Sequence, residues 1–245
     1  MIKPQKQLAN VSSLLIVSST NEDGILGKNF LEQNEQTKQN QKKIFDKINV
    51  DQNQTVKIIV AHTSQLKIIE KFQPIIENID GVITRQKNLY FALPTGDCIP
   101  LIIYDSKKEI LAFLHVGWRG VVGKITTKAV KAMTKQFGCN PTELLAYLGP
   151  AIDKECYQQK GWPIFIKMML FIISGNTKFA TLLNGKISFD IKGATKKQLI
   201  KQGVPAGQIE VSSYCTNCQP ELLSSHFREG SVRKSSILTV VGMKG

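Results

Sequence analysis

The sequence feature that most constrains the fold is a pair of apolar runs at residues 101–104 and 110–116, separated by the polar segment D-S-K-K-E. Both runs are rich in residues that favour strands, and the polar segment suits a hairpin turn. In a hairpin, the residues at the end opposite the turn come close together. Cys98 and His115 are therefore expected to meet, although 17 residues separate them in the sequence.

The rest of the chain alternates further strand-like runs with two helical segments. Apolar residues fall at helical spacing from residue 121 until Gly138 ends the pattern, and a second helix is expected at residues 191–202 before Gly203. No internal repeat or linker divides the chain, so we expect one α/β domain of the α+β type over residues 1–245. The additional strand-like runs are residues 11–18, 56–61, 82–84, 89–93, 144–148, 209–214 and 237–241.

Two segments stand out by composition. Residues 32–43 are rich in Gln, Asn and Lys, which is typical of an exposed helix or a mobile loop. Residues 162–174 are almost wholly apolar but too short to span a bilayer, and we interpret them as a core segment. The first residues are polar and lack the apolar stretch of a secretory signal. These patterns predict a cytoplasmic protein without membrane contact.

The net charge of +13 raises the question of a nucleic-acid partner. Only four of the 32 basic residues are arginines, and the lysines are scattered along the chain. Arginine is the residue expected to dominate the recognition of bases. A non-enzymatic, basic nucleic-acid-binding protein therefore remains an alternative, but the sequence offers no element that would contact bases.

Three residues suggest a metal site, and each is placed at the end of an expected strand: His62, Cys98 and His115. A catalytic zinc ion usually takes three protein ligands and leaves a fourth position for water or substrate. Two other interpretations fit the same residues. They can be ordinary buried, hydrogen-bonded side chains, or Cys98 can act as the nucleophile of a cysteine hydrolase with His115 as its base.

Three other motifs are candidates for binding. Residues 117–123, G-W-R-G-V-V-G, can present backbone N–H groups and Arg119 to an anion, or can simply form a tight connection to a helix. The C-T-N-C motif at residues 215–218 suggests a structural zinc site or a redox pair, although a pair of reduced thiols is the simpler expectation. The segment S-H-F-R at residues 225–228 places His226 and Arg228 where they can contact a substrate or lie on a surface loop. Five cysteines in a chain without a signal peptide do not suggest a disulfide framework.

Several of these motifs, taken in order, resemble one known family. The chain is similar to the laccase-domain proteins named multicopper polyphenol oxidases and peptidoglycan editing factors, whose members are described as zinc-dependent purine nucleoside phosphorylases with adenosine deaminase activity. The similarity covers about residues 60 to 235. The matching motifs are A-H-T-S from Ala61, T-G-D-C-I-P from Thr95, H-V-G-W-R-G from His115, L-G-P-A-I from Leu148, C-Y from Cys156, C-T-N-C from Cys215 and S-H-F-R from Ser225.

The resemblance implies a mixed α/β fold with a β-sandwich between helices, and an active-site zinc ion bound by His62, Cys98 and His115. It implies phosphorolysis of adenosine, inosine, guanosine and methylthioadenosine, and hydrolytic deamination of adenosine. In this scheme Asp97 moves protons or, equally, orients the loop or a ligand, and with Cys98 and His115 it belongs to the catalytic set. Arg119, Arg228 and His226 contact the nucleoside or phosphate. We expect a monomer or a weak homodimer.

Two positions depart from the family pattern. Asn21 stands where an N-terminal arginine is usual, and Phe227 replaces one of two arginines near the C-terminus. These departures predict that phosphate is held more weakly or by other lysines. A role in cell-wall editing, which one family name suggests, is a further alternative. A multicopper phenol oxidase is disfavoured because the chain has only three histidines.

Overall fold

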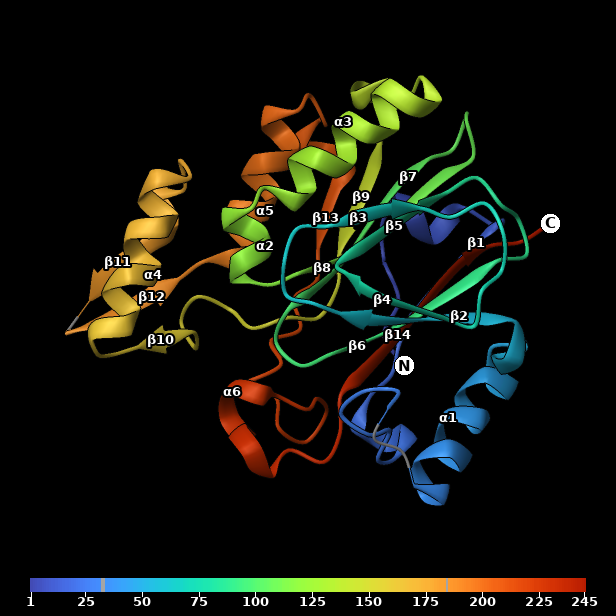
Figure 1. The fold of residues 1–245 in the computed structure, drawn as a ribbon, viewed down its shortest axis with the longest axis horizontal. Coiled ribbons are helices and arrows are strands. Elements are labelled where there is room, and N and C mark those ends of the chain that lie inside the picture. Colours follow the sequence, from blue (N-terminus) through green and yellow to red (C-terminus); the bar gives the residue numbers. More distant parts are fainter. Residues whose placement is uncertain (32–33, 184) are drawn as a thin grey trace.

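The computed structural model describes residues 1–31, 34–183 and 185–245, and two β-sheets packed face to face form its centre (Figure 1). The first sheet has the strand order β1-β14-β6-β2-β4 and the second has the order β13-β9-β7-β8-β5-β3. The strands of the first sheet are β1 (Leu14–Ser18), β14 (Ile237–Met243), β6 (Tyr90–Thr95), β2 (Thr55–Val60) and β4 (Ile75–Ile79). Those of the second are β13 (Ile209–Val211), β9 (Leu145–Leu148), β7 (Ile99–Asp105), β8 (Ile110–Val116), β5 (Gly81–Thr84) and β3 (Leu66–Ile68).

The main core between the sheets comes from side chains that alternate in direction along each strand. On β7, Ile102 and Tyr104 point toward the first sheet, where they meet residues such as Val56 and Phe91. The alternate residues of β7 and β8 point the other way, onto helices. Because both faces of these two strands are buried, their sequences are almost continuously apolar.

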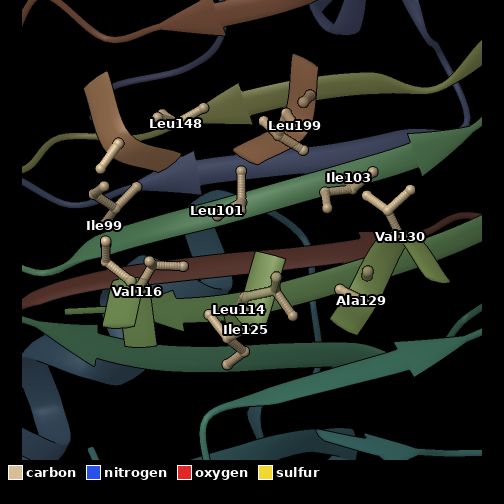
Figure 2. Close-up of a cluster of buried hydrophobic side chains, with 14 of the residues drawn as sticks. Ile99, Leu101, Ile103, Leu114, Val116, Ile125, Ala129, Val130, Leu148 and Leu199 are labelled. Atoms are coloured by element: carbon tan, nitrogen blue, oxygen red, sulfur yellow. The ribbon is translucent and has the colours of Figure 1, made fainter. Parts of the chain in front are cut away.

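Helices cover the outer faces of both sheets. Helices α2 (Trp118–Val122), α3 (Ile125–Phe137) and α5 (Ile191–Lys201) pack on the second sheet. Figure 2 shows Ile125, Ala129 and Val130 of α3 and Leu199 of α5 against strand residues that include Ile99 and Leu101. Helix α1 (Glu35–Lys47) packs on the first sheet through Ile44 and Phe45. The expected β-sandwich between helices is confirmed.

A smaller unit projects from one side of the sandwich (Figure 1). It contains α4 (Trp162–Ile173) and a three-stranded sheet in the order β10-β12-β11, formed by β10 (Gln158–Gln159), β12 (Lys186–Phe189) and β11 (Ala180–Leu183). A short helix, α6 (His226–Glu229), lies in the C-terminal segment before β14. None of the helices in the described residues is long and apolar enough to cross a bilayer.

Most expected elements are confirmed within a few residues, but three interpretations need correction or completion. The helix expected from residue 121 is two helices, because the chain turns at Lys124, whose φ angle is 57°. The expected core segment at residues 162–174 is helix α4, and only one side of it is buried: Phe171 lies in the core, whereas Ile166, Met169 and Ile173 are more than half exposed. Residues 35–47 form a helix with a buried face. Residues 32 and 33 of that stretch lie outside the described residues.

The cysteines also differ from the expectation of reduced thiols. Cys218 of the C-T-N-C motif forms a disulfide with Cys156, 62 residues earlier in the chain. Cys215 stays free and buried, and its sulfur lies within 4.8 Å of both bonded sulfurs. The disulfide joins segments that are far apart in sequence, so the spacing within the C-T-N-C motif could not predict it.

Candidate metal centre

The structure brings His62, Cys98 and His115 together at one end of the hairpin. One ligand atom from each of the three side chains lies within 4.8 Å of the others. The register of β7 and β8 pairs Ile99 with Val116 and Pro100 with His115, so Cys98 is next to the histidine as the hairpin pattern predicts. This part of the prediction is confirmed.

His62 reaches the cluster from the first sheet. One residue separates it from the end of β2, and a φ angle of 55° turns the chain there toward the second sheet. The rings of His62 and His115 meet edge to face, with 4.9 Å between their centroids. The cluster therefore joins both sheets at the edge of the sandwich.

Asp80, which the sequence did not single out, holds the cluster in place from the turn between β4 and β5. Its Oδ1 atom lies 2.9 Å from Nδ1 of His115 and also accepts the backbone N–H of His62 at 2.9 Å. Its Oδ2 atom accepts hydrogen bonds from the hydroxyl and the backbone N–H of Thr63. If Nδ1 of His115 carries the proton of the bond to Asp80, Nε2 is free to bind a metal.

The protonation of the two histidines differs because their surroundings differ. Burial, followed by the nearby His115, lowers the pKa of His62, so this imidazole is neutral at neutral pH. Burial opposes the charged form of His115, but the neighbouring Cys98 and Asp80 outweigh it and raise the pKa of His115 to about 9. Burial likewise opposes the charged form of Asp80, but hydrogen bonds from His115 and Thr63 leave its pKa below the ordinary value.

The glycine-rich loop after His115 closes around the thiol of Cys98. A Cβ atom added at Gly117 would lie 2.8 Å from the sulfur of Cys98, which is closer than such atoms approach in proteins. Trp118 and Arg119 follow and line the same pocket as the three ligands. The guanidinium of Arg119 lies 4.5 Å from the centre of the Trp118 ring, a cation–π contact that orients the arginine.

Asp97 has both carboxylate oxygens occupied by donors of the protein. Oδ1 accepts hydrogen bonds from the hydroxyls of Thr216 and Ser225 at 2.6 and 2.7 Å, and Oδ2 accepts the backbone N–H of Phe227 at 2.6 Å. The residue is buried, with a φ angle of 92°. This geometry favours a role in anchoring the Cys98 turn to the C-terminal segment over a role in proton transfer.

His226 and Arg228, both predicted to contact substrate, are placed differently. His226 is exposed at the start of α6, and after burial and His115 it is among the neighbours that lower the pKa of His62. The guanidinium of Arg228 donates to the carbonyls of Thr216, Asn217 and Leu223 and to Glu229. Arg228 is therefore engaged in holding the C-terminal loop and does not line the metal pocket.

The two departures noted in the sequence have local partners. Asn21 donates from Nδ2 to the carbonyl of Pro220 at 2.9 Å and so ties the N-terminal segment to the C-terminal loop. The ring of Phe227 meets the ring of Tyr157 edge to face at 5.5 Å. Both positions make packing or loop contacts here.

Two cationic side chains near the metal centre, those of Arg233 and Lys167, were not among the residues predicted from the sequence. Nη1 of Arg233 lies so close to Gly96 that an added Cβ atom would sit 1.7 Å from it. Lys167, the charged residue of apolar helix α4, is 5% exposed and donates to the hydroxyl of Tyr157 and to Gln159. Burial lowers the pKa of Lys167 to about 7. The signal in the sequence was a lone lysine inside an apolar run.

Comparison with known proteins decides the family. A profile of the family described as multi-copper polyphenol oxidoreductase laccase matches residues 17–244. The chain belongs to this laccase family. The match covers all three candidate ligands and includes the segment with Asp80. It confirms the family resemblance inferred from the separated motifs.

Named relatives and a solved structure of this laccase family bear on activity and fold. The chain is 29% identical to purine nucleoside phosphorylase YlmD of Bacillus subtilis over 76% of this chain and 66% of that protein. It is 28% identical to adenosine deaminase RL5, from an unknown prokaryotic organism, over 62% of this chain and 57% of that protein. These alignments thus span somewhat less than two thirds of the relatives' length. The structure of YlmD from Geobacillus stearothermophilus has the same fold, with a TM-score of 0.84 at 19% identity over 96% of this chain and 93% of that chain.

Proposed function

We propose that the protein is a zinc-dependent purine nucleoside phosphorylase that accepts adenosine, inosine, guanosine and methylthioadenosine and also deaminates adenosine. The names of the relatives support processing of purine nucleosides in general. The observation that carries the proposal is the convergence of His62, Cys98 and His115 on one point, with Asp80 behind them.

The donor set fits zinc. Two imidazoles and one thiolate are ligands that zinc takes in catalytic sites, with one position left for water or substrate. His62 is neutral at neutral pH, as a ligand must be, whereas His115, whose pKa is about 9 without metal, must lose one proton when it binds zinc. Asp80 fixes the ring of His115. When bound, zinc supplies Lewis acidity, which activates water for deamination or polarises the substrate group that it contacts.

The residues of the chain itself would bind and orient the substrates. Arg119 lines the pocket and is held against Trp118, so it offers a fixed cation to phosphate. The indole of Trp118 offers an apolar surface for the purine. His226, at the start of α6, is placed to contact the part of the substrate that projects from the pocket. Asp97 would act indirectly, by holding the turn that carries Cys98.

One assay tests the proposal. Purified, zinc-loaded protein is incubated with adenosine, with and without phosphate, and adenine, ribose 1-phosphate and inosine are measured. We expect adenine to form only with phosphate and inosine to form without it. The Cys98→Ala variant should lose both activities. Cys139→Ala is the matched control, because Cys139 is also a free cysteine but lies beside Asp105, at the turn end of the hairpin.

The same assay also distinguishes the proposed zinc enzyme from the main alternative, a cysteine hydrolase. Absence of turnover, or turnover that Cys98→Ala leaves unchanged, would contradict the proposal. Activity that survives zinc chelation but is lost when Cys98 is alkylated would point instead to a cysteine hydrolase with His115 as base. Cys139 is no competitor for the alkylating reagent, because burial raises the pKa of its thiol to about 12.

A further inference from the structure

Helix α4 has two apolar faces, one packed on the protein and one exposed. On the packed face, the ring of Phe171 is buried and lies 5.2 Å from the ring of Phe189 of β12. Ile164 and Met168, from the neighbouring turns of the helix, pack on the same core. These contacts attach α4 to the rest of the chain and turn its opposite face outward.

The exposed face carries large apolar side chains three and four residues apart, which is the spacing of successive helical turns. Ile166, Met169 and Ile173 are more than half exposed, and Leu170 is 36% exposed. We call these four residues the outer stripe. Helix α4 and its small sheet stand at one side of the two central sheets (Figure 1), so a large partner can reach the outer stripe. A contiguous apolar surface of this kind usually marks a contact with a protein or a membrane.

The charged side chains of the projecting unit are all positive. Residues 156–189 contain four lysines and no aspartate, glutamate or arginine. Lys167 lies buried under α4, whereas Lys160 before the helix, Lys178 after it and Lys186 at the start of β12 are exposed. None of these three exposed lysines forms an ion pair with another described residue, although lysines elsewhere in the chain do. The apolar face is therefore accompanied by uncompensated positive charge.

This combination fits the surface of an anionic membrane better than a second copy of the chain. If two copies met through the outer stripe, the lysines of both projecting units would come together, and the units have no acidic residue to pair with them. An anionic membrane supplies the opposite charge through its headgroups and an apolar layer beneath them. A helix with an apolar face and neighbouring lysines is the usual composition of a segment that lies in a membrane interface.

We propose that α4 docks the protein on the surface of a membrane that contains anionic lipid. The outer stripe enters the boundary between headgroups and acyl chains, and Lys160, Lys178 and Lys186 face the headgroups. The helix lies in the plane of the surface and does not cross the bilayer. The expectation of no membrane contact rested on residues 162–174 lying in the core, and the outer stripe removes that basis. Docking is independent of the activity at the metal pocket.

Flotation of the zinc-loaded protein with lipid vesicles tests the proposal at about 0.15 M salt, where attraction between distant charges is largely screened. One set of vesicles is phosphatidylcholine, and the other contains phosphatidylcholine and phosphatidylglycerol in equal parts. We expect binding to the anionic vesicles and little binding to the neutral ones. Ile166→Ser/Ile173→Ser keeps the charge but should weaken binding at least about tenfold, because two large apolar side chains no longer leave water. Ile200→Ser, at an exposed isoleucine of α5, should bind as the wild type does.

A second pair of variants tests the lysines. Lys160→Gln/Lys178→Gln/Lys186→Gln should also bind the anionic vesicles at least about tenfold more weakly, because each lysine near the surface adds to the attraction. The matched control removes the same charge from three exposed lysines of α3 and α5, as Lys131→Gln/Lys135→Gln/Lys201→Gln, and should lose much less affinity.

Met169 provides a measurement on the wild type if a variant fails to fold. Anionic vesicles should slow its oxidation by hydrogen peroxide several-fold, and neutral vesicles should not. The proposal is overturned by equal binding of Ile166→Ser/Ile173→Ser and wild type, by an equal loss in the two triple-lysine variants, or by oxidation of Met169 that anionic vesicles do not slow. A dimer that forms without lipid and is lost in Ile166→Ser/Ile173→Ser would assign the outer stripe to self-association and would overturn it as well.

Discussion

Nδ1 of His115 lies 2.9 Å from Oδ1 of Asp80, and both side chains are almost completely buried. The same carboxylate accepts the backbone N–H of His62, so one residue orients two candidate ligands. Asp80 is therefore the residue through which the geometry of the metal centre can be changed without removing a ligand.

Replacement of Asp80 by asparagine should weaken zinc binding about 10- to 100-fold, which is the usual effect of losing the partner of a metal-bound histidine. The asparagine keeps the size of the side chain but loses the charge that stabilises the oriented ring. Competition with a chelator of known affinity measures the change. Asp46→Asn, on the exposed face of α1, should bind zinc like the wild type. An unchanged affinity in Asp80→Asn would contradict the orienting role.

Replacement of Gly117 tests how closely the glycine-rich loop packs against the thiol of Cys98. In Gly117→Ala the new Cβ atom would lie 2.8 Å from the sulfur of Cys98, so either the thiol or the loop must move. We expect a loss of about 1–3 kcal/mol in the free energy of unfolding, which is typical of overpacking, together with weaker zinc binding. Urea denaturation and chelator competition measure the two effects. Gly207→Ala, where an added Cβ meets nothing within 4 Å, should show neither effect.

How much of the centre could be predicted from the sequence depends on how local each relationship is. Cys98 and His115 are joined by a single hairpin, so alternation and a polar turn were enough to bring them together. Asp80 meets His115 only because β5 pairs with β8 in the second sheet, a tertiary pairing that carries no local pattern. The disulfide between Cys156 and Cys218 was missed for the same reason.

Helix α4 shows a second reason why prediction from the sequence is incomplete. Its apolar composition predicted burial, because an apolar run usually lies in the core. In the structure it belongs to a small projecting unit that covers only one of its faces, so Ile166 and Ile173 are exposed. The direction of its lysine toward the aromatic rings of Tyr157 and Phe189 depends on that tertiary arrangement.

Replacement by glutamine should affect substrate binding at Arg119 and folding stability at Arg228. Arg119→Gln should raise KM for phosphate while the free energy of unfolding stays nearly unchanged, because Arg119 faces the pocket. Arg228→Gln should instead lose about 1–3 kcal/mol of stability, because it leaves three carbonyl groups without their donor. Phosphate kinetics and urea denaturation separate the two. A stable Arg228→Gln with a raised KM would show that Arg228 binds substrate after all.

Lys167 should make stability depend on pH in a defined direction. The pKa of its amine is about 7 in the folded chain and near 10.5 when unfolded, so between these values the unfolded chain binds more protons. Stability should therefore rise with pH across this window, and the cost of the buried charge is greatest below pH 7. Lys167→Met should be more stable than the wild type by a few kcal/mol at pH 5.5.

The advantage of Lys167→Met should shrink toward pH 10, because the wild-type lysine is then neutral in the folded state. Urea denaturation at pH 5.5 and 9.5 provides the comparison. Lys178→Met, which removes an exposed lysine, should change stability by the same small amount at both values. A difference between Lys167→Met and wild type that does not vary with pH would show that Lys167 is not held in the neutral form.

Metal analysis of the purified protein tests the central claim most directly, because it needs no knowledge of the substrate. Protein dialysed against zinc and then freed of loosely bound ions is compared with Cys98→Ala and with the control Cys139→Ala. We predict about one zinc ion per chain in the wild type and in Cys139→Ala, and close to none in Cys98→Ala. One tightly bound zinc ion in Cys98→Ala, or none in the wild type, would contradict the proposed metal centre of His62, Cys98 and His115.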